Sequence, residues 1–108
     1  MRWAQINALM GMMQISIAPW RVLSKENVER VLAALKLHEK FGDGDTFLKL
    51  AKNAAGTGEP VVRHMAYVFP GEGFETAGVQ FMLGNDIMAA PVLEKRAKNK
   101  SVKFPSGI

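Results

Sequence analysis

Apolar residues dominate the first stretch of the chain, where they predict a helix. Residues 3–13 are apolar on almost every face, so this helix needs other elements around all of it. Pro19 ends it, because proline disfavours helical geometry in the residue before it. Polar residues interrupt the apolar run, which falls short of the ~20 apolar residues that span a bilayer. We therefore expect neither a targeting nor a transmembrane segment.

A second helix is predicted to begin after Ser24, a residue type that favours the N-cap position. Gly42 is the natural stop of this helix, and Asp45 is predicted to cap a third helix over residues 46–55. The apolar stripe of the second helix repeats at intervals of three and four residues: Val28, Val31, Leu32 and Leu35.

The pattern changes to β in the second half of the chain. Residues 61–69 are β-branched and aromatic between two prolines, which predicts a largely buried strand. Residues 81–92 predict a turn and then another strand, and residues 101–104 are predicted to pair with that strand. Three helices thus precede β-rich sequence, with no internal repeat.

Composition excludes several classes of protein. The chain has 108 residues, of which 48% are hydrophobic, and no cysteine, which excludes a disordered tail, a disulfide scaffold and thiol chemistry. His38 and His64 lie in separate segments without ligand spacing. The segment from Gly42 to Asp45 resembles half of a calcium loop but lacks the later acidic ligands. We expect no metal and no cofactor, and the absence of cysteine fits a cytoplasmic protein without locating it.

The formal net charge of +4 comes largely from one short region near the C-terminus. This region lacks interleaved aromatic residues, so a solvated turn is favoured over weak anion contact. A nucleic-acid binder would rest on net charge alone. The basic residues of the region are Lys95, Arg96, Lys98, Lys100 and Lys103.

Five short strings, in order, resemble glycoside hydrolase family 31, and the resemblance extends from residue 2 to residue 107. The strings are Arg2-Trp3-x-Gln5, Pro19-Trp20, Gly58-Glu-Pro-Val-Val-Arg63, Gln80-Phe-Met-Leu-Gly84 and Ala90-Pro-Val92.

The resemblance implies an α/β fold, namely a fragment of a (β/α)8 TIM barrel that runs into a C-terminal β-sandwich domain. Residues 1–80 would supply the last helices and the eighth strand of the barrel, with that strand within residues 59–69. Residues 81–108 would begin the β domain. Such a barrel usually needs about 250 residues. The apolar first helix and the ending after half a hairpin also suggest a piece of a larger fold.

The resemblance also implies the chemistry of a retaining α-glycosidase, which needs two carboxyl groups. Family members carry the nucleophile in a Trp-x-Asp-x-Asn-Glu string, and Asp43, Asp45 and Asp86 do not lie in such a string. We expect the catalytic pair upstream of this chain and the chain alone to be inactive. The alternative is a non-enzymatic remnant that associates with a partner chain.

Three residues are candidates for contact with a carbohydrate substrate, which the chain would meet within the parent enzyme and beside the rest of its barrel. Ser16 lies where many members have a sugar-holding histidine, and Trp20 could stack on a sugar. Ser16 could instead be a packing or solvent-exposed serine, and a packed loop tryptophan is favoured for Trp20. Arg63 is expected to pair with a barrel carboxylate outside this chain, or else to contact the ligand. Neither a nucleic-acid nor a membrane partner is expected. The chain also departs from the family pattern at Val79, where members usually have an aspartate.

Overall fold

The computed structural model describes residues 1–107, apart from the side chain of Asp43. The chain divides into two units, Met1–Lys49 and Leu50–Ile108. Each unit has its own packing and is described separately, although helix α3 (Thr46–Thr57) crosses the division. No helix among the described residues is both long and apolar enough to cross a membrane.

The first unit is built on α2 (Lys25–Asp43), against which the short helix α1 (Arg2–Asn7) packs. The predicted N-cap is confirmed, because the Ser24 hydroxyl accepts a hydrogen bond from the Asn27 N–H at 3.4 Å. Within the predicted apolar stripe, Val31 is buried, whereas Leu32 is exposed. The helix continues through Gly42, so the predicted stop was one residue early.

The first helix differs from its prediction in both length and burial. It ends at Asn7, and the Leu9 and Met10 amides donate to carbonyls three residues back, those of Ile6 and Asn7. The predicted helix over residues 3–13 was therefore too long. Its expected burial on all sides is also wrong for this chain, since Trp3 is 67% and Met12 81% exposed.

The third helix begins at Thr46, as predicted, and ends at Thr57, two residues beyond the predicted end. Asp45 precedes it with a left-handed backbone (φ +58°), not the extended backbone typical of an N-cap. The Asp45 carbonyl accepts a hydrogen bond from the Lys49 N–H at 2.8 Å.

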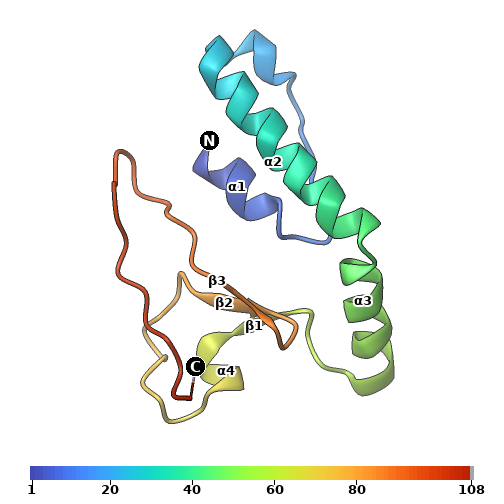
Figure 1. The fold of residues 1–108 in the computed structure, drawn as a ribbon, viewed down its shortest axis with the longest axis vertical. Helices are drawn as coiled ribbons and strands as arrows, with labels where there is room; N and C mark the ends of the chain where they lie inside the picture. The colour runs from blue at the N-terminus through green and yellow to red at the C-terminus, as the bar shows by residue number, and fades with distance from the viewer. Residues whose placement is uncertain (108) are drawn as a thin grey trace. The chain divides into compact units, whose positions relative to one another are not determined.

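The second unit contains one antiparallel sheet in the order β1 (Val62–His64), β2 (Phe81–Leu83) and β3 (Ile87–Ala89), shown in Figure 1. In β1 and β2, Arg63 lies opposite Met82. The turn between β2 and β3 starts at Gly84, whose φ of +63° favours glycine. The turn and following strand predicted within residues 81–92 are confirmed as this turn and β3, which ends at Ala89, whereas β2 before the turn was not predicted.

The strand predicted over residues 61–69 ends early, at His64. The chain then forms one helical turn, α4 (Met65–Val68). The His64 side chain caps this turn, because its Nδ1 accepts a hydrogen bond from the Ala66 N–H at 3.1 Å. Met65 from α4 packs with Phe74 and Met82 in the core of the unit. This local capping explains why a β-rich sequence turns into a helix here.

Residues 101–104 do not form the predicted strand. Side chains hold this segment instead. Buried Gln80 donates from Nε2 to the Lys103 carbonyl at 2.8 Å and accepts from the Lys103 N–H at 3.0 Å. These two bonds replace those of an antiparallel residue pair.

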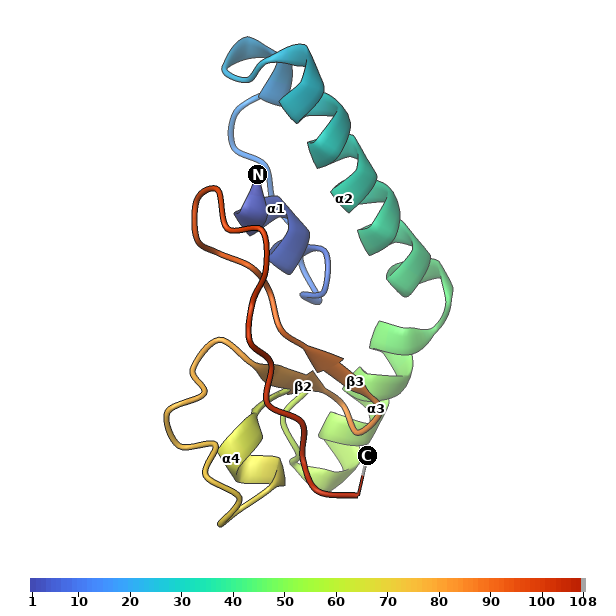
Figure 2. The same cartoon turned by 60° about the vertical axis from the view of Figure 1, so that its left-hand side comes forward.

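Other contacts extend this attachment along residues 100–106, which we call the C-terminal strap. The Lys103 ammonium donates to the carbonyls of Glu72 and Gly73 and lies 4.7 Å from the centre of the Phe74 ring. The Ser106 N–H donates to the Glu72 carboxylate at 2.9 Å. The strap therefore runs beside the loop that leads into β2 (Figure 2).

Replacing Gln80 tests whether this side chain attaches the strap. Gln80→Ala removes both hydrogen bonds to Lys103, so we expect a loss of about 1–3 kcal/mol in the free energy of unfolding and faster hydrogen exchange at the Lys103 amide. Urea denaturation followed by circular dichroism measures the first effect. Gln14→Ala at an exposed position is the control, and equal losses from the two variants would contradict the assignment.

Candidate functional site

The predicted sugar-facing residues of the first unit lie in the irregular segment between α1 and α2. The segment begins at Ala8, which is fully buried and whose carbonyl lies 3.2 Å from Nδ1 of His38. Because a carbonyl only accepts, Nδ1 carries the hydrogen. The single 3-10 turn η1 (Pro19–Arg21) closes the segment.

Ser16 and Trp20 line two different cavities of this unit. Ser16 is exposed and borders a cavity of about 370 Å³, whereas Trp20 is 71% exposed and borders one of about 350 Å³. Ile15 and Pro19 line both cavities. The two predicted residues thus lie in one segment, beside adjacent hollows.

Arg63 lies in the second unit, on β1, and is 8% exposed. Its Nε donates to the Pro60 carbonyl and its Nη1 donates to Oδ1 of Asn85, both at 2.7 Å. The Glu59 carboxylate lies 3.8 Å from Nε. The buried guanidinium thus finds its partners within the chain, and the carboxylate expected from outside the chain is supplied by Glu59.

Glu59 also joins Arg63 to an aromatic residue on α4. The Tyr67 hydroxyl donates to Oε2 of Glu59 at 3.0 Å, the same oxygen that faces Arg63. The Tyr67 side chain is nevertheless 57% exposed. We call Glu59, Arg63, Tyr67 and Asn85 the Glu59 network.

Within this network, Glu59 raises the pKa of Tyr67 above its ordinary value of 10.0. The main cause is the hydrogen bond from the hydroxyl to Glu59, which exists only while the hydroxyl keeps its proton. Repulsion between the Glu59 carboxylate and a tyrosinate acts in the same direction, and the positive charge of Arg63 opposes it.

Of the four members of this network, only Arg63 was predicted from the sequence as a site residue. Glu59, Arg63 and Tyr67 are spaced four residues apart, as on one face of a helix. The residues between them predicted a strand, so there was no reason to expect the three side chains on a common face. Asn85 is brought to Arg63 by the β1–β2 register and the Gly84 turn. Only the hairpin prediction could have suggested that contact.

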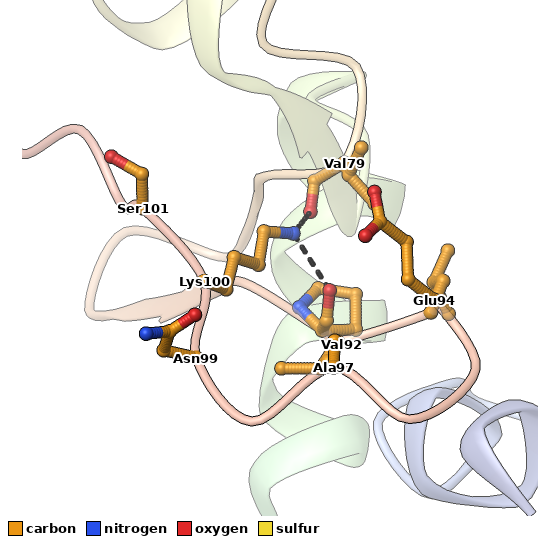
Figure 3. Close-up of a pocket in the computed structure, with 9 residues that line it drawn as sticks. Val79, Val92, Glu94, Ala97, Asn99, Lys100 and Ser101 are labelled. Carbon is orange, nitrogen blue, oxygen red and sulfur yellow. Dashed lines mark hydrogen bonds between the residues drawn. The ribbon is translucent and has the colours of Figure 1, made fainter.

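A third hollow lies within the basic region, as Figure 3 shows. The cavity measures about 320 Å³, and Lys100 crosses it to donate to the carbonyls of Pro91 at 2.7 Å and Val79 at 3.4 Å. Lys95 and Lys98 are exposed. The basic region is therefore a loop anchored by Lys100, and the predicted strand pairing on its C-terminal side is wrong.

No group of three or more potential metal-ligating side chains occurs among the described residues. Asp45 lies in the turn between α2 and α3 and Asp86 in the turn between β2 and β3, and both are exposed. Asp43 is the last residue of α2.

Comparison with known proteins connects the chain to glycoside-processing enzymes. The family model described as "Glycosyl hydrolase family 31 C-terminal domain" matches residues 58–108. The myogenesis-regulating glycosidase of Mus musculus is 34% identical over 111 residues, an alignment covering 98% of this chain and 15% of that protein.

Two further relatives match about half of the chain. A probable alpha-glucosidase of Oryza sativa subsp. japonica is 38% identical over 60 residues, covering 54% of this chain and 7% of that protein. The isomaltosyltransferase of Sporosarcina globispora is 39% identical over 59 residues, covering 53% and 5%. The chain thus spans at most 15% of the length of these three relatives.

Tyr67 is the sole tyrosine, so ultraviolet titration of tyrosinate reports its pKa directly. We expect a pKa above 10.0 in the folded chain. Because folding raises this pKa, the contact stabilises the chain fully below the ordinary value, and the stabilisation is lost as the pH rises through the raised value.

Variants of Glu59 separate the causes of this shift. Glu59→Ala removes both the hydrogen bond and the charge, so the pKa of Tyr67 should return toward 10.0. Glu59→Gln keeps an acceptor oxygen without the charge and should give an intermediate value. An unchanged pKa in Glu59→Ala would show that the contact is absent in solution.

Proposed function

Because the chain belongs to glycosyl hydrolase family 31, we propose that it is part of a retaining α-glycosidase, an enzyme that hydrolyses O-glycosyl bonds. The observation that carries this proposal is the alignment with the mouse glycosidase, which covers 98% of this chain. The rice relative is named a probable alpha-glucosidase and the bacterial relative an isomaltosyltransferase.

The proposed reaction needs catalytic groups that this chain does not supply. Retaining hydrolysis needs a nucleophile and an acid/base group about 5–5.5 Å apart. Asp45 and Asp86 lie in exposed turns, outside the family string that carries the nucleophile. The proposed enzyme therefore takes its catalytic carboxylates from residues outside this chain, and the chain alone is inactive.

Within this proposal, Ser16 and Trp20 contact the sugar. Their common segment borders two cavities, and the large exposed face of Trp20 can pack against pyranose C–H groups. Arg63 is assigned to holding its loop and strand, because its guanidinium already has partners and little exposed surface.

The proposed fold is the end of a (β/α)8 barrel followed by a β domain. The division after residue 80 stays a prediction, and two observations support an earlier one. The match to the C-terminal domain begins at residue 58, and β1 pairs antiparallel with β2, whereas barrel strands are parallel. We therefore favour a β domain that begins at Gly58.

A non-enzymatic piece that associates with a partner chain is the second candidate. The exposed apolar side chains of Trp3, Met12 and Ile17 favour a covering surface in either case. The two candidates differ in whether this covering surface brings catalytic carboxylates.

Activity assays distinguish these candidates. The pure 108-residue chain should not hydrolyse nitrophenyl α-glycosides, whereas a family 31 enzyme whose matching segment is replaced by this chain should do so. Hydrolysis by the chain alone would contradict the proposed division of labour. A folded but inactive chimera would favour the non-enzymatic piece.

In the active chimera, Trp20→Ala should raise KM about tenfold, because loss of an aromatic contact costs roughly 0.5–1.5 kcal/mol beyond its buried area. Trp20→Phe keeps an aromatic face and should retain most of the affinity. Steady-state kinetics measure both variants. An unchanged KM in Trp20→Ala would remove this residue from the sugar site.

A further inference from the structure

We propose that Tyr67 and Glu59 form a binding site for a neutral sugar ring on the second unit. The choice of a sugar rests on the proposed function. The site itself is inferred from the exposure, attachment and charge of these two side chains.

The Tyr67 ring is held in place although more than half of its surface is exposed. Its backbone belongs to α4, which His64 caps and which Met65 anchors in the core. Its hydroxyl is held by Glu59 at 3.0 Å. A ligand that stacks on this ring would therefore find it already oriented, which lowers the entropic cost of binding.

The Glu59 carboxylate offers a hydrogen-bond acceptor beside the ring. Oε2 accepts from Tyr67 and faces Arg63, while Oε1 has no hydrogen-bond partner among the described residues. The side chain of Glu59 is 41% exposed. A sugar whose C–H face lies on the Tyr67 ring can donate a hydroxyl from the ring edge to this carboxylate.

Charge selects the class of ligand. The positive charge of Arg63, 3.8 Å from the Glu59 carboxylate, offsets the negative charge of that group. The carboxylate disfavours a phosphate or another anion, and the guanidinium weakens attraction for a cation. A neutral molecule with several hydroxyl groups fits this balance better than either charged class.

The sole tyrosine makes the test specific. We expect maltotriose, added to the chain labelled with ¹³C-tyrosine, to shift the Tyr67 ring signals saturably in NMR spectra. Glycerol and tetramethylammonium serve as hydroxyl and cation controls. A larger response to tetramethylammonium than to sugar would overturn the neutral-sugar assignment.

Variants then assign the two contacts. Tyr67→Ala, followed by saturation-transfer NMR of the sugar, should weaken binding about tenfold, and Glu59→Ala should weaken it about threefold to tenfold. Phe104→Ala removes another exposed aromatic residue and should leave binding unchanged. Tyr67→Phe keeps the ring and should lose less affinity than Tyr67→Ala.

Absence of any sugar-induced change at Tyr67 through the millimolar range would overturn the inference, as would equal effects of Tyr67→Ala and Phe104→Ala. This result is separable from the proposed function. An active chimera with no response at Tyr67 would remove only this site. Binding at Tyr67 with an inactive chimera would remove only the hydrolytic role.

Discussion

A buried guanidinium organises the polar chemistry of the second unit. The strand register turns Arg63 inward, and a buried cation left without partners costs several kcal/mol. Pro60, Asn85 and Glu59 supply those partners from three places along the chain. Because Glu59 is drawn toward Arg63, it is also in position to hold Tyr67. The contacts of Arg63 thus connect strand β1, the β2–β3 turn and the exposed ring of Tyr67.

Local patterns predicted those parts of the fold that depend on nearby residues. Ser24 caps α2 through an amide three positions away, and the β2–β3 hairpin closes over a short turn. The strand over residues 61–69 was mispredicted because β-branched composition does not report the His64 side chain, which caps a helical turn within it. The helix over residues 3–13 was mispredicted because apolar content says nothing about where backbone hydrogen bonding stops.

Long-range contacts between side chains and backbone could not be predicted in this way. Gln80 holds residue 103 with two bonds where strand pairing was expected. Family resemblance identified Ser16, Trp20 and Arg63 as candidate site residues, and the structure locates the first two beside cavities. Glu59 lies within one of the strings that resemble the family but was not singled out as a site residue, and Tyr67 lies outside those strings. The contact between Glu59 and Tyr67 is understood only from the structure, in which the buried Arg63 pairs with the Glu59 carboxylate.

The C-terminal strap has a consequence for the time at which the second unit becomes complete during protein synthesis. Gln80 is synthesised 23 residues before its partner Lys103, and Glu72 is synthesised 34 residues before its partner Ser106. Until that stretch leaves the ribosome, the Phe74 ring lacks the lysine that lies over it. A nascent chain paused before residue 100 therefore holds all the residues of this core but leaves the Phe74 ring without its cover, open to chaperones and proteases.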